Sequence, residues 1–294
     1  MTSNWGGQSM VAPLKRVIVK RPQEAFVNTD RVAEQWENLA YAGPPDLELA
    51  GDQHRKFVSF IEEAGAEVLY LPEDERTGLD SMYAHDAGIM TDAGAVIFNT
   101  GKPQRRGEGA ALAAALEKWD VPVLGRIEAP AIAEGGDTLW LDPRTLAVGR
   151  GFRTDTAGIE ALRQMLQPNG IEVIDFQLSY GNGPREVLHL QSFISLLDEN
   201  LAVVHRRLLP VPLYEWLEER SVNLIDIPEE EVATQACNIL TLAPRKALMI
   251  AGNTITRDRM KAQGCTVYEF EASDISLKGM GGPTCLTRPI LRQM

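Results

Sequence analysis

One of the three cysteines in this sequence could act as a nucleophile. Cys285 stands in GGPTCLT, residues 281–287, after two glycines and a proline and before a β-like run. Glycines let the backbone turn tightly and approach a ligand closely. Cys237 and Cys265 resemble core cysteines instead. Because a lone cysteine is more often structural, Cys285 needs a chemical partner before a catalytic role follows.

The natural partner is His189, in LHLQS at residues 188–192. Taken alone, a histidine at the end of a strand is more often a hydrogen-bonded structural residue. Paired with Cys285, it would support a thiolate and protonate a departing amine. The sequence therefore indicates a candidate pair of a nucleophilic cysteine and a histidine that can move protons.

Two acidic segments could hold a cationic substrate beside this pair. EGGD, residues 134–137, contains Glu134, and DSMYAHDAG, residues 80–88, contains Asp80 and Asp86 with Tyr83 between them. Glu-Gly-Gly-Asp is also a reasonable turn sequence, so this segment alone does not establish a site. Together the segments predict carboxylates that surround a positive group.

Two arginine-containing loops could bind the opposite charge. RRGE, residues 105–108, includes Arg105, and GRGFRT, residues 149–154, includes Arg153. Exposed arginines are usually solvated surface residues. In a glycine-flanked loop near the site, an arginine could instead bind a carboxylate with two parallel hydrogen bonds.

A repeated unit must position these residues. Asp92, Asp142 and Asp198 mark the turns of successive predicted hairpins and are 50 and 56 residues apart. Each hairpin is followed by an amphipathic stretch with helical spacing and then by a short apolar run. The predicted hairpins are residues 88–99, 138–150, 193–205 and 238–252, the helices 110–119, 158–166, 212–220 and 256–264, and the strands 121–125, 171–177, 222–228 and 265–271.

A fifth ββαβ unit is divided between the two ends of the chain. It would combine a strand at 16–20, a helix at 54–65, a strand at 66–72 and a strand near 285–291. Repeated units that pack only against their neighbours suit a closed ring. The sequence thus predicts an α/β fold, a five-bladed α/β propeller (pentein) of ββαβ repeats around a central channel, with residues 1–294 as one domain. A generic α/β domain is the alternative.

The ring also predicts where the chemistry lies. Asp86, Glu134 and His189 each stand at the entrance to a hairpin. Equivalent positions in successive blades would converge on one mouth of the channel, where loops carry function. We therefore expect the site at that mouth.

The composition and charge of the chain exclude several classes of binding partner. The chain has 294 residues and a formal charge of −12, whereas nucleic-acid binding needs a basic face. No run approaches the ~20 apolar residues of a membrane span, and the N-terminus lacks a secretory pattern. Three scattered cysteines and four unpaired histidines predict neither disulfides nor a metal site. We expect a cytoplasmic protein with no cofactor, and leave a homodimer open.

These motifs resemble, in order and over nearly the whole chain, those of the dimethylarginine dimethylaminohydrolase family. That family belongs to the guanidino-group-modifying superfamily, with arginine deiminases and amidinotransferases. The resemblance rests on DSMYAHDAG, RRGE, EGGD followed by an Arg-Thr loop, His-Leu-x-Ser, and a final Gly-Gly-x-x-Cys-Leu. It implies the same five-bladed propeller.

The resemblance also implies residue roles. Cys285 matches the nucleophile and His189 the general acid and base; Glu134 and Asp86 match carboxylates that grip the guanidinium. It further assigns substrate binding to Asp80, a pocket wall to Tyr83, and the amino-acid end of the substrate to Arg105 and Arg153. The implied reaction is metal-free hydrolysis of a methylated arginine, through a covalent thiouronium on the cysteine, to citrulline and a methylamine.

Three departures leave alternatives open. Gln191 stands where deiminases and amidinotransferases have an aspartate, which favours a substituted guanidine, while His85 and Arg150 replace acidic residues. The alternatives are a deiminase of arginine or another guanidine, an amidinotransferase, and a non-catalytic propeller-fold binding protein. We also place a hypothetical mobile flap at residues 23–30.

Overall fold

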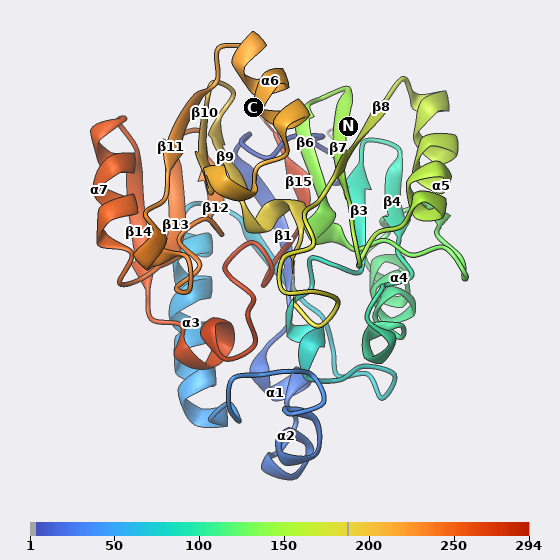
Figure 1. Cartoon of the computed structure of the whole chain (residues 1–294). Coiled ribbons are helices and arrows are strands. Elements are labelled where there is room, and N and C mark those ends of the chain that lie inside the picture. Colours follow the sequence, from blue (N-terminus) through green and yellow to red (C-terminus); the bar gives the residue numbers. More distant parts are fainter. Residues whose placement is uncertain (1–3, 187, 294) are drawn as a thin grey trace.

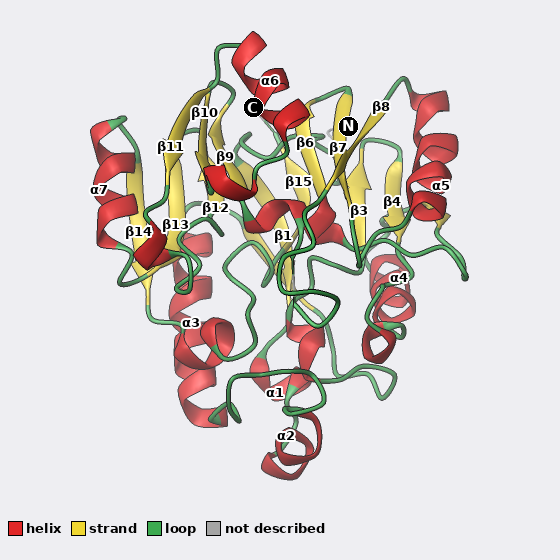
Figure 2. Cartoon of the chain, viewed as in Figure 1, coloured by secondary structure: helices red, strands yellow, loops and turns green. Residues whose placement is uncertain are grey.

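The computed structural model describes residues 4–186 and 188–293. Within these residues the strands form five three-stranded sheets. Figure 1 shows the sheets arranged around a common centre, and Figure 2 shows that the longer helices lie on the outside. The sheets are β15 (Arg288–Arg292), β1 (Leu14–Val19) and β2 (Glu67–Tyr70); β3 (Gly88–Thr91), β4 (Gly94–Ile97) and β5 (Val123–Arg126); β6 (Thr138–Asp142), β7 (Thr145–Arg150) and β8 (Glu172–Gln177); β9 (Ile194–Asp198), β10 (Leu201–Val204) and β11 (Asn223–Asp226); and β12 (Leu240–Ala243), β13 (Lys246–Ile250) and β14 (Thr266–Phe270).

Every sheet has the same internal pattern. The first strand pairs antiparallel with the middle strand, and the middle strand pairs parallel with the third. A parallel pair needs a crossover connection, which a helix supplies in each blade. The helices are α1 (Pro22–Ala25), α2 (Thr29–Gln35), α3 (Leu47–Glu63), α4 (Glu108–Lys118), α5 (Thr156–Leu166), α6 (Val211–Glu219) and α7 (Thr254–Ala262). The predicted ββαβ repeat is confirmed.

The divided blade closes the ring. β15, near the C-terminus, pairs antiparallel with β1, which pairs parallel with β2. The chain ends therefore complete one blade together, as predicted. The helix of this blade is longer than expected, because Asp46 caps it by accepting a hydrogen bond from the backbone of Leu49 at 2.8 Å.

The apolar core is divided in the same way as the sheets. Among the described residues it forms five clusters, each built from neighbouring blades. Phe193 of one blade and Leu139 of the next, for example, share a cluster and are fully buried. Strands that are covered on both faces are apolar throughout, which explains why β9 and β10 do not alternate.

The hypothetical flap at residues 23–30 coincides with helical structure, and its mobility stays a prediction. This segment forms α1 and the start of α2, and Phe26 is fully buried in the core. None of its residues lines the cavities around Cys285. The core needs the apolar side chains of this segment, so it is part of the packed structure.

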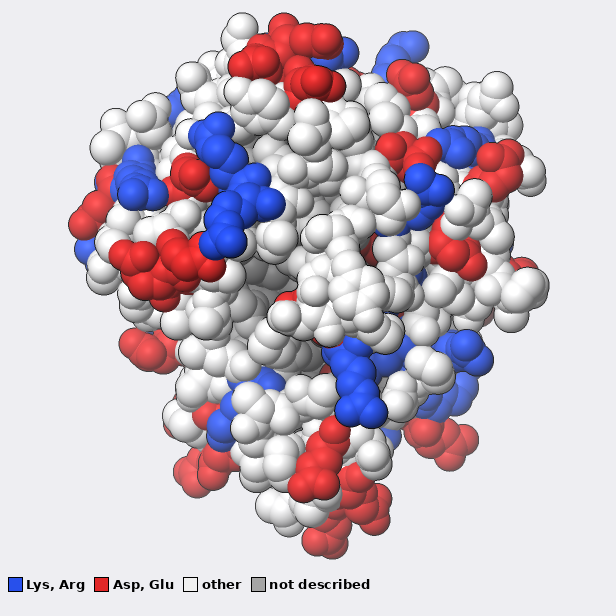
Figure 3. Space-filling model, in the orientation of Figure 1, with Lys and Arg blue, Asp and Glu red and all other residues white. Residues whose placement is uncertain are grey.

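No helix in the described part of the chain is long and apolar enough to cross a membrane. Figure 3 shows acidic and basic side chains spread around the edge of the face in view, with a mostly uncharged middle. The negative charge of the chain is thus not gathered into one acidic surface on this face.

Candidate active site

Side chains from all five blades meet at one mouth of the ring. Asp86 precedes β3, Glu134 precedes β6, His189 precedes β9, Asn238 precedes β12 and Cys285 precedes β15. The ligand atoms of the first three lie within 4.8 Å of one another. The convergence expected from the repeat is therefore present.

His189 is held in one orientation by its neighbours. Its Nε2 lies 2.7 Å from Glu134 Oε2, and its backbone N–H donates to Ser192 Oγ at 3.0 Å. Its ring lies against Gly136, where an added Cβ would come within 2.4 Å of Nδ1. Only glycine permits this approach. Nε2 is thus bonded to Glu134, while Nδ1 faces Gly136.

The surroundings of His189 favour its charged form. Burial alone lowers the pKa of His189, but the negative charges of Asp86 and Asp137 and the hydrogen bond to Glu134 outweigh it and raise the pKa to about 9. At neutral pH the ring is therefore an imidazolium that donates its Nε2 proton to Glu134.

Glu134 lies behind His189, away from the cysteine. It is fully buried, its Oε1 accepts from the backbone N–H of Lys102 at 3.0 Å, and Arg153 is 3.4 Å away. Burial raises its pKa, yet the bond and charge of His189 hold that pKa below the usual value. These contacts orient the His189 ring and favour its charged form, and the predicted grip of Glu134 on a guanidinium stays a prediction.

Cys285 is half-buried and accessible from the cavities at the mouth. Its Sγ accepts a hydrogen bond from Asn238 Nδ2 at 3.1 Å, and Asn238 Oδ1 accepts from the backbone of Thr284 at 3.1 Å. Burial raises the pKa of the Cys285 thiol to about 11, and the charge of Asp86 adds to this rise. The free protein therefore carries a neutral thiol at pH 7.

Asn238 is the residue that sequence reasoning missed. It opens the hairpin predicted at 238–252, so it occupies the same entrance position as Asp86, Glu134 and His189. Applying the repeat argument to this blade as well would have identified it. A neutral amide was overlooked because it performs no proton transfer.

Asp86 and Asp80 border the pocket that contains Cys285. Asp86 accepts from the backbone of Gly136 at 2.8 Å and from Arg105 at 2.6 Å, while Asp80 accepts from Lys102 Nζ at 2.6 Å. Burial raises the pKa of Asp86, but Arg105 and His189 together hold it well below the usual range. Both carboxylates have lone pairs left for a cation.

Tyr83 forms a wall of the same pocket. Its ring is buried beneath the glycine loop, where a Cβ on Gly281 would approach ring atom Cε1 to 2.3 Å. Burial raises the pKa of Tyr83, so the phenol stays neutral. The position predicted for this wall residue agrees with the structure.

Arg105 is committed to the protein itself. Its guanidinium donates to Glu108 at 2.9 and 2.7 Å, to Asp86, and to the backbone carbonyls of Asp80 and Tyr83. Only 5% of its surface is exposed. Arg105 also lines the pocket of Cys285, and its predicted role at the amino-acid end of a substrate stays a prediction. Its bonds also fix the Asp80–Asp86 segment.

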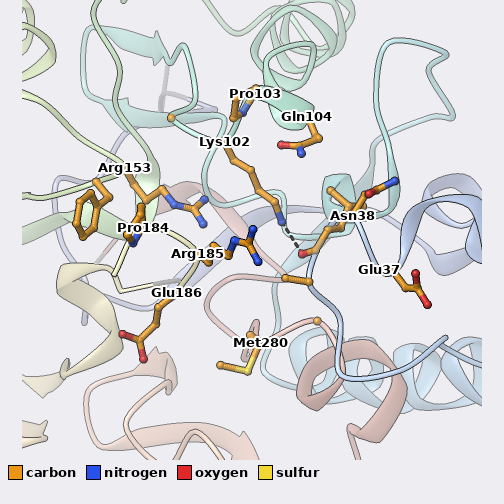
Figure 4. Close-up of a pocket in the computed structure, with 15 residues that line it drawn as sticks. Glu37, Asn38, Lys102, Pro103, Gln104, Arg153, Pro184, Arg185, Glu186 and Met280 are labelled. Atoms are coloured by element: carbon orange, nitrogen blue, oxygen red, sulfur yellow. Dashed lines mark hydrogen bonds between the residues drawn. The ribbon is translucent and has the colours of Figure 1, made fainter. Parts of the chain in front are cut away.

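Arg153 lies at the boundary of two cavities. It is buried, with NH1 3.4 Å from both oxygens of Glu134. It lines both the pocket of Cys285 and a larger cavity of about 690 Å³, which we call the mouth cavity. Figure 4 shows this cavity with Lys102, Arg153 and Arg185 around it. Arg153 can therefore meet a ligand that enters from solvent.

A smaller space lies on the other side of Cys285. This side chamber, of about 140 Å³, is lined by Cys285 and His189, by apolar side chains such as Leu188, Leu208 and Ile227, and by polar ones such as His205 and Gln235. Met280 borders the mouth cavity, the pocket of Cys285 and the side chamber. The three spaces thus adjoin one another. Cationic side chains line the mouth cavity, and apolar side chains are present in the side chamber.

Gln191 lines this chamber but is held by the backbone. Its amide nitrogen donates to the carbonyl of Thr138 at 2.6 Å and lies 2.9 Å from Nε2 of His85, whose Nδ1 is 2.8 Å from the carbonyl of Thr287. Burial and the charge of Arg288 hold the pKa of His85 well below its usual value. Gln191 therefore adds no negative charge to the site. Arg150 pairs with Asp175 at 3.4 Å, outside these cavities.

Asp86, Glu134 and His189 are also the one acidic and histidine group among the described residues that could ligate a metal ion. Arg105 and Arg153 already neutralise these carboxylates, and His189 carries a proton near neutral pH. A divalent cation would have to displace these positive charges. The donor set therefore fits a charged organic ligand better.

A five-bladed α/β propeller with a cysteine, an imidazolium and buried carboxylates at one mouth defines the guanidino-group-modifying enzymes. Within that class, the sequence model of "N,N dimethylarginine dimethylhydrolase, eukaryotic" matches residues 27–292. The chain belongs to this family of dimethylarginine dimethylaminohydrolases, and it is an enzyme of that type.

Individual relatives agree over nearly the whole chain. The N(G),N(G)-dimethylarginine dimethylaminohydrolase of Pseudomonas aeruginosa is 27% identical over 273 residues, which cover 93% of this chain and 98% of the relative. The Streptomyces coelicolor enzyme of the same name is 28% identical over 281 residues, covering 94% and 96%. A solved structure of a Pseudomonas aeruginosa mutant complexed with citrulline has a TM-score of 0.76 at 25% identity, covering 94% and 99%.

Proposed function

We propose that this enzyme hydrolyses Nω-methylated arginine to citrulline and a methylamine through a covalent intermediate on Cys285. One observation carries the proposal. The pocket of Cys285 has the buried carboxylates Asp80 and Asp86, and the adjoining chamber offers apolar side chains among its polar ones. A guanidinium with methyl substituents matches that arrangement, because its charge needs carboxylates and its methyl groups need apolar walls.

The first step forms the carbon–sulfur bond. The bound guanidinium brings positive charge next to the thiol and lowers its pKa from about 11, so Cys285 loses its proton to solvent. The thiolate adds to the guanidinium carbon. The His189 ring then donates a proton to the departing nitrogen, the carbon–nitrogen bond breaks, and the amine leaves a thiouronium on Cys285.

The second step restores the enzyme. His189, now neutral, removes a proton from water, and the resulting hydroxide adds to the thiouronium carbon. The carbon–sulfur bond breaks and the cysteine leaves as the thiolate, while the hydroxyl proton on the carbon passes to solvent and the neutral ureido product forms. Glu134 keeps the ring oriented and stabilises its charge in each protonated stage.

The decisive experiment compares citrulline release from asymmetric dimethylarginine, monomethylarginine and arginine by the wild type and by Cys285→Ser. We expect the methylated substrates to be preferred and the variant to lose activity on the order of 10⁴-fold or more. Mass spectrometry of the quenched wild type should show the adduct on Cys285. A preference for arginine would favour the deiminase alternative, and product formation only with an amine acceptor would favour an amidinotransferase.

Three further expectations belong to this proposal. We propose that residues 1–294 act as one catalytic domain, because each core cluster joins neighbouring blades. A cytoplasmic location suits three free thiols, of which Cys237 and Cys265 are buried. The oligomeric state stays open, with a homodimer as one candidate, and sedimentation velocity tests it directly.

A further inference from the structure

The side chamber beside Cys285 is larger than a methylated departing group requires. Its volume is about 140 Å³, and a water molecule takes up about 30 Å³ of liquid, so the chamber has room for about four or five non-hydrogen atoms. A departing methylamine or dimethylamine would place one or two carbons in it. The chamber can therefore hold a longer substituent, and the side chains of its wall indicate the chemistry of that substituent.

The chamber adjoins the bond that the proposed reaction breaks. Cys285 and His189 line it, and they also line the pocket that contains Asp80 and Asp86. A guanidinium held by these carboxylates has its carbon at Cys285 and its departing nitrogen within reach of His189. A substituent on that nitrogen would extend away from the carboxylates, and the side chamber is the space that adjoins it there.

Two polar side chains of the chamber have a buried nitrogen without a hydrogen bond to any described residue. His205 is only 8% exposed, and its Nε2 lies 3.9 Å from Glu229, which is too far for a hydrogen bond. The second is Nε2 of Gln235. By contrast, the amides of Gln191 and Asn238 in the same wall are bonded to the protein. Buried polar groups normally have partners, so a ligand that supplies one is favoured here.

The backbone of Gln235 is held in a conformation that its residue type rarely adopts. Its φ is 60°, in the left-handed region that favours glycine. Its backbone N–H donates to the carbonyl of Val232 at 3.0 Å, and its carbonyl accepts from the backbone N–H of Asn238 at 3.0 Å. Such strained positions persist where the surrounding structure fixes them, and they cluster at ligand sites. Gln235 is therefore tied to the residue that bonds the sulfur of Cys285.

The chemistry of the unpaired groups restricts the ligand. Gln235 Nε2 can only donate, so its partner must accept a hydrogen bond, whereas His205 Nε2 donates or accepts according to its tautomer. A cationic ammonium end cannot accept. A carboxylate end would be repelled, because Glu186 lines the chamber and Glu229 lies beside His205. A neutral hydroxyl satisfies these conditions, and the apolar side chains of the chamber can cover the carbons that lead to it.

We infer that the side chamber selects arginines whose departing nitrogen carries a short substituent ending in a hydroxyl, such as 2-hydroxyethyl, with Gln235 and His205 as the specificity-determining residues. The inference rests on the proposed function, since it uses the same nucleophile and the same two steps. The carbon–nitrogen bond breaks, the departing nitrogen takes the proton of His189, and 2-aminoethanol leaves in place of methylamine. Water then releases citrulline from Cys285 as before.

The test uses two substrates whose substituents are equal in size. Nω-(2-hydroxyethyl)arginine and Nω-propylarginine differ only in a terminal hydroxyl or methyl group, and monomethylarginine is the reference substrate. Citrulline release is measured for the wild type, Gln235→Leu, Gln235→Asn and His205→Leu. Asparagine tolerates a positive φ and keeps the amide but withdraws it by one methylene, so it controls for the strained backbone. The matched control is Gln263→Leu, because Gln263 is exposed and lies outside the chamber.

The readout is the ratio of kcat/KM for the hydroxyethyl substrate to kcat/KM for the propyl substrate. In the wild type we expect a ratio of about 10 to 100, because the hydroxyl satisfies buried groups that a methyl group would leave unpaired. In Gln235→Leu the ratio should fall below about three, since a leucine there favours the propyl group. Gln235→Asn and His205→Leu should give intermediate ratios, and Gln263→Leu should give the ratio of the wild type.

Three results overturn the inference while the proposed function stands. The first is a wild type that hydrolyses monomethylarginine but prefers the propyl to the hydroxyethyl substrate or releases citrulline from neither. The second is a ratio that does not change in Gln235→Leu. The third is an equal loss on all three substrates in both Gln235 variants, which would assign the residue a structural role. If the wild type released no citrulline from monomethylarginine either, the proposed function itself would fail, and the inference with it.

Discussion

Arginines occupy two regions of this site and differ in their surroundings: one is buried and bonded to carboxylates, and the other is exposed to solvent. In the floor, which we define as Asp86, Arg105, Glu108, Glu134 and His189, every charged group is buried and bonded to another. At the mouth, Arg185 is exposed and has no such partner among the described residues. The same residue type is therefore a structural anchor in one place and a solvated group in the other.

The difference follows from solvation. A buried guanidinium is stable only when carboxylates and carbonyls replace its water, so its donors are used up by the fold. An exposed one keeps its water and can exchange it for a ligand. The buried charged groups of the floor therefore hold one another in place, and the exposed groups at the mouth are the ones that can exchange water for a ligand.

The largest expected effect is on stability and comes from the floor. Arg105→Met should lower the free energy of unfolding by about 3–5 kcal/mol, because Asp86 and Glu108 would remain buried without their cation. Urea denaturation at pH 8 measures it. The matched control, Arg106→Met, changes an exposed neighbour and should stay within about 0.5 kcal/mol of the wild type. Equal effects of the two variants would remove the distinction between floor and mouth.

Glu108 offers a sharper form of the same test. Burial raises the pKa of Glu108 to about 7 even though Arg105 opposes this. Adding Glu108→Gln to Arg105→Met should therefore recover part of the lost stability, since one of the two uncompensated charges is gone. Strictly additive losses would contradict this explanation.

The next effect is on the pH dependence of catalysis. With a thiol pKa of about 11 and a histidine pKa of about 9, thiolate and imidazolium coexist best between these values, so kcat/KM should rise to pH 9, stay level, and fall above 11. Glu134→Gln removes a charge that raises the pKa of His189. The rise of kcat/KM with pH ends at this pKa, so in the variant it should end about one pH unit lower.

The maximal kcat/KM, reached between the two pKa values, should fall by about tenfold in Glu134→Gln. The reason is that a smaller fraction of His189 is protonated at the pH values where Cys285 is a thiolate. A purely structural role for Glu134 would lower activity equally at all pH values and leave the positions of the rise and the fall unchanged. Profiles with monomethylarginine between pH 6 and 11 distinguish the two outcomes. Circular dichroism over the same range checks that the fold persists.

The smallest effect is that of salt. Screening shortens from about 10 Å at 0.1 M to about 3 Å at 1 M, and it acts mainly on exposed charges. The KM for monomethylarginine should therefore rise about two- to threefold between 0.05 and 0.5 M NaCl. The stability difference between the wild type and Arg105→Met should not depend on salt. The opposite pattern would mean that the two regions have been assigned the wrong way round.

Much of this protein was readable from its sequence. The hairpins near Asp92, Asp142 and Asp198 recur with helices and strands in a fixed order, which requires a ring of blades. Local hydrophobic pattern and turn residues decide such elements, because neighbours along the chain supply most of their contacts. The same repeat placed Asp86, Glu134 and His189 at one mouth together with Cys285.

The direction in which each side chain points was decided only by the tertiary structure. Sequence could not show that Glu134 lies behind His189, that Arg105 is bonded to Glu108 and Asp86, or that Asn238 reaches Cys285. These contacts join residues of different blades or loops, and their geometry depends on how the whole ring packs. The type and charge of a residue can be read from the sequence, but a hydrogen bond depends on the positions of two residues in the folded protein.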